Sequence, residues 1–227
     1  MNQLVMALAA FLALHSIPAL PPVRAGAIAL LGRETYLGLY SLVSILVLAW
    51  LFHAALNTDY IELWAPAGWQ ARLTLMLSPL GLLLVIAGLL SPNPFSISFR
   101  HGDEPGAIVQ ITRHPVQWGF MLWSFGHLIV NGDLRSLVLF GGLGLFSVAG
   151  LFILDRRARR RLDAGWPALA ARYPMVPLAG ILTGRTKFRI DGPFTLALAV
   201  TAVITLWLLT GGHAALFGAD PLTALSY

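Results

Sequence analysis

The sequence contains no cysteine and very little charge. Charged residues make up 11% of the 227 residues, whereas a soluble globular domain carries about 25%. So few charged groups cannot cover the surface of a soluble enzyme, and a chain with 57% hydrophobic residues is too apolar to be disordered. The absence of cysteine excludes disulfides, thiolate metal sites, iron–sulfur clusters and covalently attached c-type haem. What is left is a multi-pass membrane protein that forms one compact unit.

Basic residues are also missing from the start of the chain, where the first is Arg24. A secretory signal would begin with Lys or Arg before its apolar stretch. We therefore expect the first apolar run to be a retained membrane helix, ended by Pro21-Pro22, which cannot continue a helix.

The apolar runs predict an all-α fold, a polytopic transmembrane helical bundle of about six helices that forms a single domain over residues 1–227. A spanning helix needs about 20 mostly apolar residues. The third run contains Pro79, which predicts a kink. The predicted helices cover residues 4–20, 36–56, 73–90, 115–130, 137–154 and 194–210.

Charge in the intervening loops predicts the orientation. Nine of the 15 basic residues lie in residues 155–192, the fifth loop, while the second and fourth loops carry none apart from Arg72 and Arg135, which flank helix starts. Under the positive-inside rule, the odd loops face the cytoplasm and both termini lie on the outer side. The net charge of +5 therefore reflects topology, and we expect no nucleic-acid partner. The arginine-rich start of the fifth loop is interpreted as an anchor on anionic lipid.

Histidines in or beside the predicted spans are the main candidates for function. Four of the six have this position, namely His15, His53, His114 and His127, whereas His101 and His213 are expected to be solvated. An ionisable group in a membrane span is costly and indicates a functional site, although a hydrogen bond to a neighbouring helix is the alternative. Histidines without cysteines or acidic clusters favour haem b, which binds through neutral imidazole. Zinc is less favoured because the spans hold no carboxylate.

The depth of each histidine gives a first test of which pair could share a haem. At 1.5 Å per residue, His53 lies roughly 10 Å and His127 roughly 7–8 Å to the outer side of the middle of their helices. His15 lies roughly 4–5 Å to the cytoplasmic side. Depth therefore favours the pair His53 and His127, and a pair of His15 and His127 requires a tilted haem or kinked helices.

The segment Thr112-Arg113-His114-Pro115 is the densest motif. Thr112 can cap a helix, and proline fits the first helical turn. A helix N-terminus with Arg113 and His114 beside it is a place to hold an anion. The alternative is an ordinary helix start at the lipid boundary. A second motif, Gly141-Gly142-x-Gly144, predicts close helix packing, either within the bundle or in a homo-oligomer.

Several motifs, in order along almost the whole chain, resemble those of the NnrU family of bacterial membrane proteins. The matching stretches are Leu14-His15-Ser16-Ile17-Pro18, Pro22-Val23-Arg24, Gly32-Arg33-Glu34, Thr112-Arg113-His114-Pro115, Trp118-Gly119, Leu122-Trp123, His127-Leu128, Asn131-Gly132-Asp133, Trp166 through Tyr173 and Val176-Pro177. The resemblance implies a multi-pass protein of the bacterial inner (cytoplasmic) membrane. It also implies a link to the expression or maturation of nitrite and nitric oxide reductases in denitrification.

The same superfamily includes 15-cis-zeta-carotene isomerase, a haem b membrane enzyme with histidine ligands. By resemblance, His15 and His127 are the expected haem ligands, with His53 in reserve and Arg113 and His114 as further cofactor-binding candidates. The implied substrate is an apolar or isoprenoid polyene. Where the isomerase has a cysteine near its second histidine, this chain has Ser124, so a thiolate ligand is not expected.

A weaker resemblance links the chain to membrane S-adenosylmethionine-dependent methyltransferases of the isoprenylcysteine and phospholipid type. These also have Arg-His-Pro before a helix, but their later acidic pair is replaced here by arginines. A non-enzymatic assembly or transport factor is the other alternative. Whether the chain is an enzyme is left open by the sequence.

Overall fold

The computed structural model describes residues 1–102 and 104–226, and its regular structure there is helical apart from one isolated β-bridge between Glu62 and Asp133. The predicted all-α class is confirmed. The chain divides into two compact units, which are described separately. The first comprises Met1–Ala65 and Gly132–Gly142, and the second comprises Pro66–Asn131 and the residues from Leu143 onward.

The first unit contains α1 (Asn2–Ser16), α2 (Pro21–Leu31) and α3 (Arg33–Leu56), and both α1 and α2 pack against α3. The prediction of one helix over residues 4–20 and a loop over 21–35 is wrong in detail, because α1 ends at Ser16 and α2 occupies most of that loop. The two helices are bent by 83°. Contrary to the prediction, Pro21 does not end the first helix but begins the second, because a proline at the first helical position loses no hydrogen bond.

A tight corner before the next helix completes this unit. Gly132 has a positive φ of 64°, and its carbonyl accepts hydrogen bonds from the backbone N–H groups of Leu63 and Trp64. The Asp133 carboxylate then caps α7 (Leu134–Ser136) by accepting from the Ser136 N–H at 3.0 Å. These bonds hold the turn that leads into α7. The π-helical η1 (Leu137–Gly141) follows.

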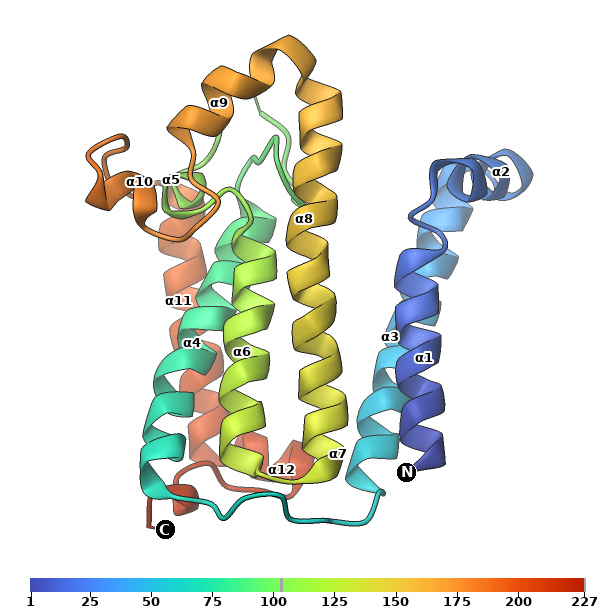
Figure 1. Cartoon of the computed structure of the whole chain (residues 1–227), viewed down its shortest axis with the longest axis vertical. Helices are drawn as coiled ribbons and strands as arrows, with labels where there is room; N and C mark the ends of the chain where they lie inside the picture. The colour runs from blue at the N-terminus through green and yellow to red at the C-terminus, as the bar shows by residue number, and fades with distance from the viewer. Residues whose placement is uncertain (103, 227) are drawn as a thin grey trace. The chain divides into compact units, whose positions relative to one another are not determined.

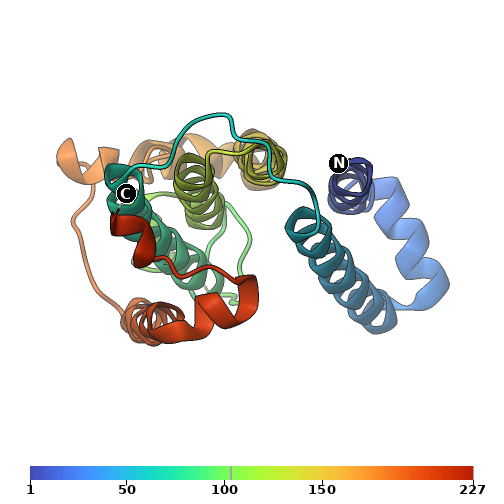
Figure 2. The same ribbon diagram turned by 90° about the horizontal axis from the view of Figure 1, so that it is seen from below.

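Four long helices run along one another in the second unit, α4 (Gly68–Leu90), α6 (Pro115–Asn131), α8 (Gly142–Leu162) and α11 (Gly192–Trp207) (Figures 1 and 2). The closest approach is between α4 and α6, where a Cβ atom on Gly81 would lie only 2.6 Å from the Gly119 carbonyl oxygen. Small residues let membrane helices pack this closely. The Thr74 hydroxyl adds a bond between the same helices by donating to the Gly126 carbonyl at 2.8 Å.

Shorter elements cover one end of this unit. They are α5 (Ile108–Ile111), η2 (Asp163–Gly165), α9 (Trp166–Arg172) and α10 (Ala179–Leu182), while η3 (Leu208–Gly212), α12 (His213–Phe217) and η4 (Thr223–Ser226) follow α11. Helix α8 continues eight residues past its predicted end at residue 154, so the start of the predicted fifth loop is helical. Arginine and alanine are good helix formers, so the helix continues beyond its apolar part. The length of the apolar run therefore underestimates the length of the helix. The buried core packs here and includes Leu84, Phe95, Ile108, Val109, Tyr173 and Phe194.

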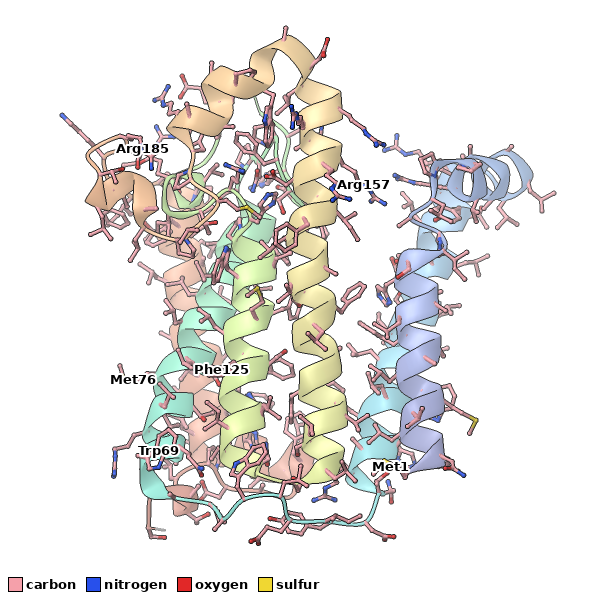
Figure 3. All side chains as sticks on the ribbon, in the orientation of Figure 1. Met1, Trp69, Met76, Phe125, Arg157 and Arg185 are labelled. Carbon is pink, nitrogen blue, oxygen red and sulfur yellow. The ribbon has the colours of Figure 1, made fainter. Side chains whose placement is uncertain are left out.

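Apolar side chains face outward along the long helices. Met76 of α4 is 72% exposed and lies on the outside of the bundle (Figure 3), and Leu145 of α8 is 73% exposed. Four stretches are long and apolar enough to cross a membrane, or five with the bent pair α1–α2 as one span. Exposed apolar surface on this scale indicates a bilayer, so the chain is a multi-pass membrane protein. The count of six spans and the outer placement of both termini stay predictions.

Candidate functional site

The polar site of the second unit is built at the start of α6. Pro115 begins this helix. The residues before it are hydrogen-bonded to the segment that follows α9. The Arg113 N–H donates to the Pro174 carbonyl at 2.8 Å, and the Thr112 hydroxyl donates to the Met175 carbonyl at 2.7 Å. The Thr112 hydroxyl oxygen in turn accepts from the His114 N–H at 3.3 Å. The backbone of the Arg-His-Pro motif is therefore held rigidly.

Arg113 is only 9% exposed and is fixed on three sides. Its Nε donates to Asp155 Oδ1 at 2.7 Å, its Nη1 donates to the Tyr173 carbonyl at 3.0 Å, and its guanidinium lies 5.2 Å from the centre of the Trp166 ring. The anion beside this helix start is therefore the carboxylate of Asp155. Sequence reasoning missed this residue because it treated the arginine-rich segment as a loop, whereas α8 carries Asp155 back to α6.

His114 shares the same carboxylate and is fully buried. Its Nε2–H donates to Asp155 Oδ1 at 3.0 Å, while Nδ1 is buried and has no hydrogen-bond partner among residues 1–102 and 104–226. Burial lowers the pKa of His114, and the Asp155 carboxylate opposes this shift only in part. The imidazole is therefore neutral near pH 7 with its lone pair on Nδ1. That nitrogen can accept a proton, accept a hydrogen bond or bind a metal.

This lowered pKa predicts a pH dependence of stability. In the unfolded chain His114 titrates near the ordinary value of about 6.5, so below that pH the unfolded state binds a proton that the folded state does not. The free energy of unfolding should then fall as the pH decreases from about 6.5. Thermal unfolding in detergent at a series of pH values measures this slope. The slope should be shallower in His114→Gln than in His101→Gln, whose exposed ring lies in a loop, and equal slopes would contradict the prediction.

His127 lies near the other end of α6, 13 residues from His114 and therefore roughly 20 Å along the helix. One iron cannot bind both side chains. The His127 Nδ1–H donates to the Trp123 carbonyl at 2.9 Å, and the Ser78 hydroxyl lies 3.5 Å from the same nitrogen. The prediction that His213 is simply solvated is wrong, because its half-buried ring lies 6.4 Å from that of His127 at an angle of 24°. Helix α12 brings it there, which the weakly apolar tail did not reveal.

The tautomers of these histidines test whether they suit a haem iron. A bond from Nδ1–H to a carbonyl places the lone pair on Nε2 and fixes the ring, as in metal-ligating histidines. His127 has such a bond, and His15 of the first unit has one to the Phe11 carbonyl at 2.8 Å. His53 differs, because the Asn57 amide donates to its Nδ1 at 3.3 Å, which leaves the proton on Nε2. His15 and His127 therefore have the donor chemistry of haem ligands, and their pairing stays a prediction.

Ser124 occupies the position at which the resemblance would place a cysteine. It lies on α6, is 1% exposed, and its hydroxyl oxygen has no hydrogen-bond partner in the described part of the chain. A serine hydroxyl is a much weaker iron ligand than a thiolate. The site thus offers imidazole as its metal-binding group.

Comparison with known proteins adds to this geometry. A family model described as NnrU protein matches residues 3–221. The 15-cis-zeta-carotene isomerase, chloroplastic, of Zea mays is 33% identical over 93 residues, which are 40% of this chain and 25% of the relative. The match thus spans about a quarter of the relative's length. No solved structure matches the chain.

Proposed function

Because the chain belongs to the NnrU family, we propose that this multi-pass membrane protein binds haem b through His127 and acts as an isomerase on an apolar polyene. The observation that carries the proposal is the bond from His127 Nδ1–H to the Trp123 carbonyl, which places the lone pair of the imidazole on Nε2. The similarity to a carotene isomerase supports the choice of substrate class.

The residues of the chain have distinct roles in this proposal. When bound, haem supplies an iron that can exchange an electron with a conjugated substrate. The Trp123 carbonyl holds the His127 ring in one orientation and raises the basicity of its other nitrogen. An apolar polyene can reach the protein from the lipid, because apolar side chains cover the outer faces of its helices. Bacterial inner-membrane location and a role with nitrite and nitric oxide reductases are further proposals that rest on the family alone.

The absorption spectrum of the detergent-purified full chain tests haem binding. We expect a Soret band and a pyridine haemochrome of the b type after expression in haem-replete cells. A colourless protein would contradict the proposal. Incubation with a cis polyene, followed by chromatographic separation of the isomers, tests the activity, and haem-free protein is the control. Binding of S-adenosylmethionine would instead favour the methyltransferase alternative.

A further inference from the structure

A basic cleft lies in the second unit apart from the histidine site. It has a volume of about 350 Å³ and is lined by Gln110, Arg172, Arg185, Thr186, Lys187 and Arg189. Its four cations are exposed, and none of them forms an ion pair within residues 1–102 and 104–226. A concentration of positive charge without its own counter-charge favours binding of an anion.

The floor of the cleft is made of buried polar groups. Gln110 of α5 is 7% exposed, and with its amide oriented to suit both neighbours it accepts from Arg189 Nε at 2.7 Å and donates to the Lys187 carbonyl. Arg189 also donates through Nη2 to the Pro105 carbonyl at 2.6 Å. These bonds hold the Arg189 guanidinium against the body of the unit while three of its five N–H groups stay available.

Arg172 ends α9, and a tight turn after α10 presents Arg185 and Lys187. The N–H groups of Arg185 and Thr186 both donate to the Gly180 carbonyl, at 2.8 and 3.1 Å, and Arg185 Nε donates to the Thr183 hydroxyl at 2.9 Å. Arg185 lies at the side of the second unit (Figure 3). The nearby Asp191 does not line the cleft, and its carboxylate instead accepts from the N–H groups of Ala107 and Phe194.

Exposed apolar side chains adjoin the cleft and indicate the source of the anion. Leu182 is 82% exposed, Phe188 is 51% exposed and Ile190 is 60% exposed, and the last two alternate along the chain with the basic residues of the cleft. Basic groups beside exposed apolar groups are typical of the membrane interface, where the first contact headgroups and the second enter the acyl region. A free phosphate ion would make no use of these apolar groups.

We propose that this cleft binds the phosphate of an anionic phospholipid headgroup. Arg172, Arg185, Lys187 and Arg189 contact the phosphate oxygens, and the adjoining apolar side chains contact the acyl chains. The cleft differs from the arginine-rich part of α8, in which Arg159 and Arg160 are exposed on the helix and line no cleft. Lipid binding at the cleft does not depend on the proposed haem chemistry.

Lipid binding to the full chain in detergent micelles tests the proposal. One set of micelles contains phosphatidylglycerol, and a parallel set contains phosphatidylcholine. Retained lipid is counted by native mass spectrometry. Each basic residue at an anionic surface contributes about fivefold to affinity, so the double variant Arg185→Gln/Lys187→Gln should bind phosphatidylglycerol about 25-fold more weakly. The matched variant Arg159→Gln/Arg160→Gln removes the same charge outside the cleft and should change the affinity less than about threefold. Unfolding midpoints of both variants check that each is folded.

Three outcomes would overturn the proposal. Equal losses in both double variants would show that only net charge matters, and equal retention of phosphatidylcholine and phosphatidylglycerol would exclude a headgroup preference. Displacement of the lipid by inorganic phosphate, at an ionic strength where chloride has no effect, would assign the cleft to free phosphate instead. Loss confined to the cleft variant, with phosphate no better than chloride as a competitor, is the expected result.

Discussion

His127→Ala is expected to remove at least about nine-tenths of the haem b absorbance of the purified protein, because the variant lacks the iron-binding nitrogen itself. Loss of a group that only orients a ligand already lowers metal affinity about 10–100-fold. The measurement is the ratio of Soret to protein absorbance at equal protein concentration. His101→Ala is the matched control, since its ring is exposed in a loop, and it should leave this ratio unchanged.

Variants of the other histidines identify the second ligand of the haem iron. The resemblance implies His15 as the second ligand, and in that case His15→Ala should convert a six-coordinate, low-spin spectrum into a five-coordinate one; the His15 Nδ1 bond to the Phe11 carbonyl, which leaves the lone pair on Nε2, suits such a role. His53→Ala should have no such effect, since the Asn57 amide binds its Nδ1. If His213→Ala alone produced the change, the ligand next to His127 would belong to α12. Retention of the full band in His127→Ala would contradict the proposed function.

The positions of the long helices could be predicted from the sequence, because an apolar run of about 20 residues has few alternatives to a membrane helix. Helices were predicted over residues 36–56 and 115–130. The ends of α3 and α6 lie within three residues of these predicted ends. The helix at Pro21–Leu31 was missed because Pro21-Pro22 was interpreted only as the end of the preceding helix. Hydropathy describes a residue's preference for lipid, and it does not describe the capping and first-turn geometry that decides where helices begin.

The candidate site was predicted only in part. Arg113, His114 and His127 could be identified because polar groups at membrane helices are rare. The shared partner of Arg113 and His114 could not be identified. Asp155 lies more than 40 positions further along the chain and meets these two residues only because α8 packs on the rest of the unit. Close packing was predicted at Gly141-Gly142-x-Gly144, but the close contact between Gly81 and Gly119 was not predicted. Their only common pattern is a second glycine seven residues later in each helix, at 88 and 126.

Asp155→Asn is expected to lower the free energy of unfolding by about 2–3 kcal/mol, less than the roughly 3–5 kcal/mol of a fully buried ion pair, because the Asp155 side chain is 23% exposed. The variant keeps the shape of the side chain but leaves the Arg113 guanidinium, which is 9% exposed, without its counter-charge. It also weakens the acceptor of the His114 Nε2–H. Unfolding in mixed detergent micelles with increasing dodecyl sulfate measures the change. Asp163→Asn, in which the replaced carboxylate is exposed, is the matched control and should cost less than about 0.5 kcal/mol.

A double-mutant cycle with Arg113→Gln separates the ion pair from other effects of the substitution. If the two side chains stabilise the protein mainly through each other, the double variant should be less destabilised than the sum of the two single variants, by at least about 1 kcal/mol. Exact additivity would contradict the coupling, and a small effect of Asp155→Asn would contradict the burial of the pair. Because the Asp155 carboxylate raises the pKa of buried His114 and the Arg113 guanidinium lowers it, Asp155→Asn should widen the pH range below about 6.5 over which stability falls, whereas Arg113→Gln should narrow it.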